Sequence, residues 1–322
     1  MDRDSRIYIA GHTGLVGSAL DARLRADGHT RILTRRHADL DLTRQSEVES
    51  FFEAERPEYV FLAAARVGGI GANAARPAEF IHANLAIQAN ALHAAYRFGV
   101  RRLLFFGSSC AYPRDAAQPL REDDLLTGPL EPTSEPYAMA KLAGISMCAA
   151  YNRQYGTRFI PVIPATVYGP GDNFDPETSH VLPALLGRFR EAMRRTSRDG
   201  HDAVTVWGTG AARREFLFVD DLTRACLFLM RLEEERLQVL LRMPVPVINI
   251  GTGGEIAIGE LARLIGRIVG HEGRLAFDAS RPDGAPRKRL DTARLDRMGW
   301  RPSVSLEEGI RKTYEWYETV AR

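Results

Sequence analysis

A strand, turn and helix pattern near the N-terminus constrains the fold more than any other feature. Residues 6–20 read RIYIAGHTGLVGSAL, in which an apolar strand leads into Gly11, Gly14 and Gly17 and then into leucines at helical spacing. Glycines suit this turn because the chain bends sharply, a pyrophosphate can approach the backbone, and the helix start offers free N–H groups. The pattern is typical of a dinucleotide site.

Strand and helix patterns continue to alternate further along the chain. Apolar runs TRILTR (30–35), YVFLAAA (59–65) and RRLLFFGSS (101–109) are separated by helical patterns at about 44–55 and 78–98. This rhythm predicts an α/β fold with a Rossmann-like doubly wound parallel sheet and a smaller α/β substrate-binding domain. We expect residues 1–170 and about 216–250 to form the dinucleotide domain, and about 171–215 and 251–322 the substrate domain.

Composition excludes several classes of protein. The 43 Lys and Arg residues nearly balance 41 Asp and Glu residues, so the chain lacks a global basic field for nucleic acid. No apolar run is long enough for a membrane span and no signal-peptide pattern opens the chain, which favours a soluble cytoplasmic protein. Three cysteines are too few for a disulfide framework or a CxxC zinc site. Cys148 and Cys226 lie in apolar helical runs and are expected to be core residues.

The end of the second strand bears on cofactor choice. An NAD site usually has an acidic residue there, whereas this chain reads LTRRH with Arg35 and Arg36. Arginines favour a 2′-phosphate and hence NADP; the alternative is two solvated surface arginines. We also place Leu15, Val16 and Asp41 in the cofactor site.

A tyrosine and a lysine are candidates for catalysis. Tyr137 and Lys141 in EPYAMAK are one helical turn apart, so their side chains share a face. A neighbouring ammonium is expected to lower the pKa of the phenol. Ser108 or Ser109 would bind the carbonyl oxygen that Tyr137 protonates during hydride transfer. The alternative is an ordinary surface pair.

Several segments resemble the extended short-chain dehydrogenases/reductases, and more closely their branch of GDP-L-fucose synthases. They include GHTGLVG, GSSCAYP, LEPTSEPYAMAKLAGI, YGPGDNF, SHVLPALLGRF and FDASRPDGAPRK, and the similarity runs nearly end to end. The resemblance implies a GDP-4-keto-6-deoxyhexose substrate, epimerisation at C3 and C5, and reduction at C4 by NADPH. Alternatives are a related GDP-4-keto-sugar enzyme of a colitose or deoxyheptose pathway, a reductase without epimerase activity, or a non-enzymatic nucleotide sensor.

The resemblance also implies roles for individual residues. Ser108 binds the carbonyl, Tyr137 donates the proton and Lys141 supports it. Cys110 and His180 act as base and acid in the epimerisation, although His180 alone could be a helix-start residue bonded to backbone. Sites for the GDP-sugar are assigned to Arg188, Trp207, Arg214 and Lys288. No metal is implied.

Two departures from the family pattern concern specificity. Thr13 stands where an arginine is usual in GHRG, and Thr166 stands where an asparagine is usual in PTNLYGP.

A second glycine cluster, NIGTGG at 249–254, is interpreted as a turn between strand and helix. The resemblance also implies a homodimer through a four-helix bundle, because two helices with apolar stripes, at about 78–98 and 136–155, are the usual pairing surface in the extended family.

Overall fold

Six parallel strands form the central sheet of the protein. The computed structural model describes residues 1–175, 178–195, 202–281 and 283–320. The strand order is β10-β5-β4-β3-β1-β2, and every neighbouring pair is parallel. The strands are β1 (Ile7–Ala10), β2 (Ile32–Leu33), β3 (Tyr59–Leu62), β4 (Arg102–Phe106), β5 (Phe159–Pro164) and β10 (Ile248–Ile250). The predicted doubly wound parallel sheet is confirmed.

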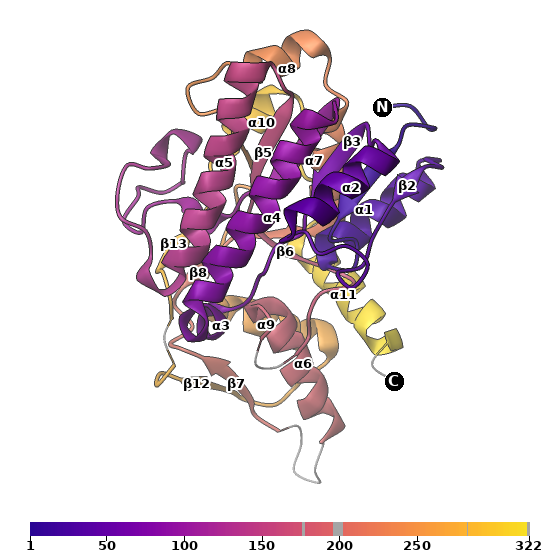
Figure 1. The fold of residues 1–322 in the computed structure, drawn as a ribbon. Coiled ribbons are helices and arrows are strands. Elements are labelled where there is room, and N and C mark those ends of the chain that lie inside the picture. Colours follow the sequence, from indigo (N-terminus) through magenta and orange to yellow (C-terminus); the bar gives the residue numbers. More distant parts are fainter. Residues whose placement is uncertain (176–177, 196–201, 282, 321–322) are drawn as a thin grey trace.

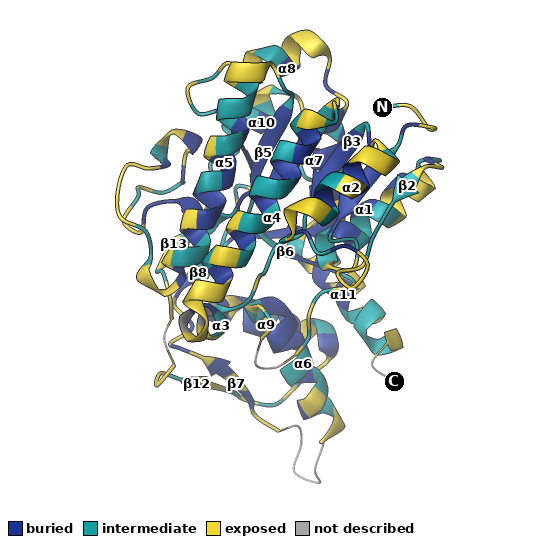
Figure 2. Cartoon of the chain, in the orientation of Figure 1, coloured by how far each residue is buried: buried dark blue, intermediate teal, exposed yellow. Residues whose placement is uncertain are grey.

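Helices cover the sheet, as Figure 1 shows. Helix α4 (Pro77–Arg97) packs against both α2 (Gln45–Glu55) and α5 (Glu135–Tyr155), while α1 (Leu15–Ala26) packs against α7 (Val219–Met230). In Figure 2 the central strands β1, β3, β4, β5 and β10 are mostly buried, and the outer sides of the helices are exposed. Among the described residues no helix combines the length and apolar character needed to cross a membrane.

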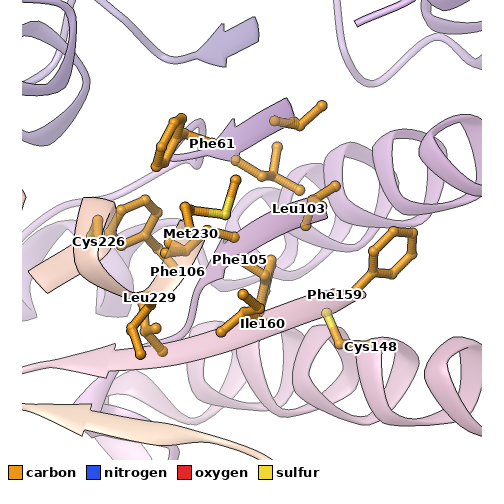
Figure 3. Packing of buried hydrophobic residues seen from close by; sticks show 14 of the residues in the cluster. Phe61, Leu103, Phe105, Phe106, Cys148, Phe159, Ile160, Cys226, Leu229 and Met230 are labelled. Atoms are coloured by element: carbon orange, nitrogen blue, oxygen red, sulfur yellow. The ribbon is translucent and has the colours of Figure 1, made fainter. Parts of the chain in front are cut away.

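The main core lies between the sheet and these helices. Its strands contribute continuous apolar runs, as expected for parallel strands covered on both faces. Figure 3 shows Cys148 of α5 beside Phe159, and Cys226 of α7 in the same region as Met230. Both thiols are fully buried, so their prediction as core residues is confirmed.

A second apolar cluster gathers around α6 and α9, below the main sheet in Figure 1. Small sheets with the strand orders β11-β8-β13, β12-β7 and β6-β9 adjoin it. Leu290, Leu295 and Trp300 nevertheless belong to the main core. The structure thus has two apolar clusters. The domain boundaries expected from the sequence remain a prediction.

The elements of this second region and the remaining short elements have the following bounds. The strands are β6 (Thr166–Tyr168), β7 (Val204–Trp207), β8 (Arg213–Arg214), β9 (Phe216–Phe218), β11 (Ile256–Ala257), β12 (Leu275–Asp278) and β13 (Arg287–Lys288). The helices are α3 (Ile70–Ala75), α6 (Val181–Arg194), α8 (Glu234–Leu241), α9 (Ile258–Val269), α10 (Ala293–Arg297) and α11 (Leu306–Val320). Three short 3₁₀ turns are η1 (Ser109–Ala111), η2 (Glu122–Asp124) and η3 (Pro132–Ser134).

Topology brings the expected site residues to one edge of the sheet. Strand β1 lies between β2 and β3, so the direction of the strand order reverses there. Gly11 directly follows β1, and Ser108 follows β4 after one intervening residue. Carboxyl ends of parallel strands meet at the same edge, and ligands of doubly wound sheets bind in the crevice at such a reversal.

Candidate active site

In the glycine turn after β1, backbone atoms pack too closely to leave room for side chains at two positions. Gly11 has a φ of 86°, and a Cβ there would lie 2.8 Å from the Ala64 nitrogen. A Cβ on Gly17 would lie 2.1 Å from the Gly11 carbonyl oxygen. Only glycine fits at these two positions, since both contacts involve backbone atoms. The turn therefore holds α1 against the end of β1.

The start of α1 suits an anionic ligand. Gly14 is the N-cap and makes no side-chain cap, and the first helical turn has no acidic residue. No side chain of the turn therefore covers the first backbone N–H groups of α1, those of Leu15, Val16 and Gly17. The positive end of the helix dipole is open to a ligand there. The His12 Nδ1 atom in this turn is buried and has no hydrogen-bond partner among the described residues. These features fit the pyrophosphate of a dinucleotide.

The arginines after β2 differ in their surroundings. Arg35 forms an ion pair with Glu55 and lies over the Phe51 ring, 5.3 Å from its centroid. Arg36 is exposed, and no described residue forms a hydrogen bond or ion pair with its guanidinium. Asp41 accepts hydrogen bonds from the backbone and hydroxyl of Thr43 at 3.0 and 2.7 Å. Of the two arginines, Arg36 is the one whose guanidinium is available to a phosphate.

Ser108, Cys110 and Tyr137 come together beyond the end of β4. The Cys110 backbone N–H donates to Ser108 Oγ at 3.2 Å, which fixes the turn that carries the thiol. The Ser108 hydroxyl also lowers the pKa of both the Tyr137 phenol and the Cys110 thiol. Of the two serines, Ser108 is therefore the one in contact with both groups. Tyr137 packs edge-on against Phe80, with ring centroids 6.4 Å apart.

The expected effect of Lys141 on Tyr137 is wrong for this structure. Burial raises the pKa of Tyr137 well above its ordinary value, the negative charge of Cys110 raises it further, and the Ser108 hydrogen bond offsets only part. Lys141 Nζ lies 5.9 Å from the Tyr137 ring centroid and donates to the Phe106 carbonyl at 2.8 Å. Burial lowers the pKa of Lys141 to about 8. Tyr137 is thus held as a neutral phenol.

The pKa of the Cys110 thiol is shifted in the opposite direction to that of Tyr137. Burial alone would raise its pKa, but the charge of Lys288, with hydrogen bonds from Ser108, Ser134 and Lys288, outweighs burial, so the pKa lies below the ordinary 9.0. Lys288 Nζ donates to Cys110 Sγ at 3.6 Å. The buried thiols of Cys148 and Cys226 have raised pKa values. Cys110 is the one cysteine of the three suited to act as a base.

His180 lies at the start of α6 as its N-cap residue. Its side chain makes no capping hydrogen bond, so the alternative of a backbone-bonded histidine is not observed. The ring is exposed, yet surrounding chain desolvates it enough to lower the pKa of the imidazole. Within the described residues no hydrogen bond or ion pair joins it to Cys110. The structure therefore brings Cys110, Ser108 and Tyr137 into contact but leaves His180 outside that network.

The residues expected to bind the GDP-sugar line the second region. Two guanidinium groups lie over the Trp207 ring, those of Arg188 at 4.3 Å and Arg281 at 4.7 Å from its centroid. Burial lowers the pKa of Arg214, which donates to the Asp283 carbonyl at 3.2 Å. Arg214 and Lys288 are register partners in the β8–β13 pair. Cationic groups at this surface suit a diphosphate.

Sequence reasoning missed Ser134, whose hydroxyl bonds to Cys110, and Glu215. The buried Glu215 carboxylate accepts backbone N–H bonds from Thr252 at 2.6 Å, Gly253 at 2.7 Å and Leu290 at 2.7 Å. The N–H groups of the NIGTGG turn are thus already bound, in agreement with its interpretation as a structural turn. Ser134 could have been noticed because it lies three residues before Tyr137; Glu215 carries no local signal.

Known proteins similar to this chain are consistent with this geometry. A model described as the NAD dependent epimerase/dehydratase family matches residues 7–251. The GDP-L-fucose synthase 1 of Arabidopsis thaliana is 52% identical over 98% of this chain and 94% of its own length. For the GDP-L-fucose synthase of Escherichia coli (strain K12) the identity is 49%, over 97% of this chain and 96% of its own.

A solved structure shares the fold throughout. The GDP-mannoheptose C4 reductase from Campylobacter jejuni with NADP bound superimposes with a TM-score of 0.88 at 37% identity, covering 99% of each chain. The parallel sheet order agrees with this shared fold. The chain belongs to the NAD dependent epimerase/dehydratase family and, within it, to the GDP-L-fucose synthases.

Proposed function

We propose that the protein epimerises GDP-4-keto-6-deoxy-D-mannose at C3 and C5 and then reduces its C4 ketone with NADPH, giving GDP-L-fucose. One observation carries the proposal: Ser108 acts on both the Tyr137 phenol and the Cys110 thiol, and the pKa of that thiol is lowered. Reduction alone needs the serine, tyrosine and lysine. A thiolate within the same hydrogen-bond network adds a base for the acidic C–H bonds beside the ketone.

The epimerase half uses both sides of the sugar ring. Cys110 thiolate removes the proton next to the ketone, and the developing enolate oxygen is held by the Ser108 and Tyr137 hydroxyls. His180 in its protonated form returns a proton to the opposite face, which inverts the carbon. The exposed position of His180 at the start of α6 supports this role if the sugar lies between α6 and η1.

The reductase half uses the neutral state of Tyr137. Bound NADPH supplies hydride to C4. As negative charge develops on the C4 oxygen, Ser108 donates a hydrogen bond and Tyr137 gives up its proton. The raised pKa of Tyr137 supports this role, because an acid must be protonated before the reaction begins. Lys141, held by the Phe106 carbonyl, fixes the helix face that presents the phenol.

Binding of both ligands is proposed from the charges around the site. Leu15, Val16 and Gly17 would hold the pyrophosphate of NADPH, and Arg36 its 2′-phosphate. Arg188, Arg214 and Lys288 would approach the diphosphate of the GDP-sugar, with Trp207 beside them. Thr166, which belongs to β6 next to β9, would act on the choice of sugar.

Product analysis tests the proposal directly. The protein is incubated with GDP-4-keto-6-deoxy-D-mannose and NADPH, and the product is identified by NMR. We expect GDP-L-fucose. A reduced sugar with unchanged C3 and C5 would favour a reductase without epimerase activity, and no consumption of NADPH would refute the proposal.

Deuterium exchange tests the epimerase residues separately. In heavy water with NADP⁺ and no reductant, Cys110→Ser should nearly abolish exchange at C3 and C5, because a hydroxyl is a far weaker base than a thiol. His180→Asn should allow some proton removal but impair inversion. Cys148→Ala, which changes a buried core thiol, is the matched control and should exchange normally. Wild-type exchange in Cys110→Ser would remove the thiol from the mechanism.

We also propose that the protein is a homodimer paired through α4 and α5. Apolar side chains remain exposed on these two adjacent helices: Leu85 is 37% exposed, Met139 47% and Tyr155 46%. Light scattering coupled to size-exclusion chromatography should give twice the chain mass, whereas a monomeric mass would refute the pairing. The cytoplasmic location expected from the sequence stays a prediction.

A further inference from the structure

Lys288 lies against the thiol of Cys110 although the two residues are distant in sequence. Its Nζ donates to Cys110 Sγ at 3.6 Å, a distance within the range of a hydrogen bond to sulfur. Sequence reasoning assigned this lysine to the diphosphate of the substrate. In the structure its ammonium contacts a group of the protein itself, the Cys110 thiol.

The backbone around Lys288 is fixed on both sides. In β13 it is the register partner of Arg214 in β8. Two residues further on, the Leu290 N–H donates to the buried Glu215 carboxylate at 2.7 Å. The Leu120 N–H also donates to the Arg289 carbonyl at 2.8 Å. These contacts hold Lys288 at η1 before any substrate arrives.

The thiol is surrounded by groups that favour its charged form, with one exception. Besides Lys288 from β13, the Arg214 guanidinium of β8 interacts electrostatically with Cys110. The hydroxyls of Ser108 and Ser134 supply hydrogen bonds. Tyr137 of α5 is a neutral phenol in this structure and would oppose the thiolate only if it ionised. Lys288 is the cation in direct contact with sulfur.

We propose that Lys288 is a positioning residue that holds Cys110 as a thiolate in the absence of substrate. The proposal rests on the proposed function in that it names the partner of the proposed epimerase base. It differs from a purely substrate-binding role because the ion pair exists within the free protein. An ammonium close to sulfur stabilises the thiolate, whereas burial without that charge favours the thiol.

The test is the pH dependence of alkylation by iodoacetamide, measured on the full chain with NADP⁺ and without GDP-sugar. Mass spectrometry of peptides follows Cys110 separately from Cys148 and Cys226, whose burial should keep them unreactive while the chain stays folded. In the wild type we expect the alkylation midpoint of Cys110 below 9.0, the ordinary value for a thiol. A wild-type midpoint at or above that value overturns the proposal without any variant.

Charge-removing variants then identify the cation. Lys288→Met should raise the midpoint by at least about one pH unit and slow alkylation at neutral pH by about 10-fold or more. Lys288→Gln keeps a hydrogen-bond donor without the charge and should behave similarly, while Lys288→Arg should restore a low midpoint. Arg287→Met is the matched control on the same strand, since Arg287 pairs with Glu255 instead.

Each outcome separates the possible roles. If Lys288→Met keeps the wild-type midpoint and only weakens GDP-sugar binding, Lys288 acts on the substrate and the proposal fails. If the midpoint rises as expected but Cys110→Ser exchanges C3 and C5 normally, the ion pair stands and the epimerase function fails. If Lys288→Met exposes Cys148 to alkylation, that variant is unfolded. The proposal is then judged from the alkylation midpoint of the wild type and the midpoint of Lys288→Gln.

Discussion

Replacing Gly17 by alanine should damage the cofactor turn before any cofactor binds. A Cβ at this position would lie 2.1 Å from the Gly11 carbonyl oxygen, 2.6 Å from its carbonyl carbon and 2.8 Å from His12 Cα. Real Cβ contacts essentially never fall under 3.0 Å. Because all three atoms are backbone, relief requires the turn or α1 to move by about 1 Å.

The energetic cost can be worked from two opposing effects. Overpacking of this kind costs up to about 3 kcal/mol, at the upper end because backbone must move. Alanine inside a helix recovers about 1 kcal/mol relative to glycine. We therefore expect Gly17→Ala to lower the free energy of unfolding by about 2 kcal/mol. Losing one hydrogen bond to a charged phosphate costs about 1.5–3 kcal/mol, so NADPH binding should weaken by about 100-fold if one or two such bonds are lost.

Gly14→Ala is the matched control in the same turn. Its φ is −85°, which alanine adopts readily, and the nearest atom to its Cβ would be the Gly11 oxygen at 3.6 Å. Exchange of glycine for alanine at an N-cap should cost less than about 1 kcal/mol. Urea-induced unfolding and fluorescence titration with NADPH measure both variants. Wild-type stability and affinity in Gly17→Ala would refute the steric argument.

Four further predictions concern the chemistry and the packing. Tyr137→Phe should leave GDP-sugar binding intact but slow hydride transfer by at least ~100-fold in stopped-flow measurements, and near-normal turnover would exclude Tyr137 as the acid. Arg36→Ala should raise the KM for NADPH much more than that for NADH, while Arg35→Ala, which removes a side chain paired with Glu55, should affect the ratio less; equal ratios would contradict the assignment. Glu215→Gln should lower the free energy of unfolding by about 2–3 kcal/mol, because the amide NH₂ would face a backbone N–H; an unchanged urea midpoint would speak against it. The rate of inversion at C3 and C5, measured by NMR of the epimerised sugar, should follow a bell-shaped pH profile. Inversion falls at low pH as the Cys110 thiolate is protonated and at high pH as the His180 imidazolium is deprotonated, and the pKa values of both groups are lowered. An inversion rate that kept rising with pH would exclude His180 as the acid.

The parts of the site that sequence could predict are those with local patterns. Gly11 and Gly17 predict a tight turn because they lie between an apolar strand pattern and the start of a helical pattern. Tyr137 and Lys141 share a helix face, which their separation alone establishes. The buried role of Cys148 and Cys226 follows in the same way from their apolar helical surroundings.

Interactions between distant segments could not be predicted in this way. The contact of Cys110 with Lys288 depends on a strand far along the chain, and the partner of Arg35 depends on the side of α2 that carries Glu55. The pKa of Tyr137 was predicted in the wrong direction because helical spacing gives proximity to Lys141 but says nothing of burial. Desolvation is a property of the whole packed site.

The position of β10 has a consequence for how the protein emerges from the ribosome. This strand pairs with β5, yet 83 residues, 165–247, separate the two in the chain. Leu290, Leu295 and Trp300, later still, complete the same core. A nascent chain can therefore assemble β1 to β5 early but exposes apolar surface along β5 until β10 and these later residues have been synthesised. Closing so long a loop is slow, so the unfinished sheet should be open to aggregation or chaperone binding until β10 pairs with β5.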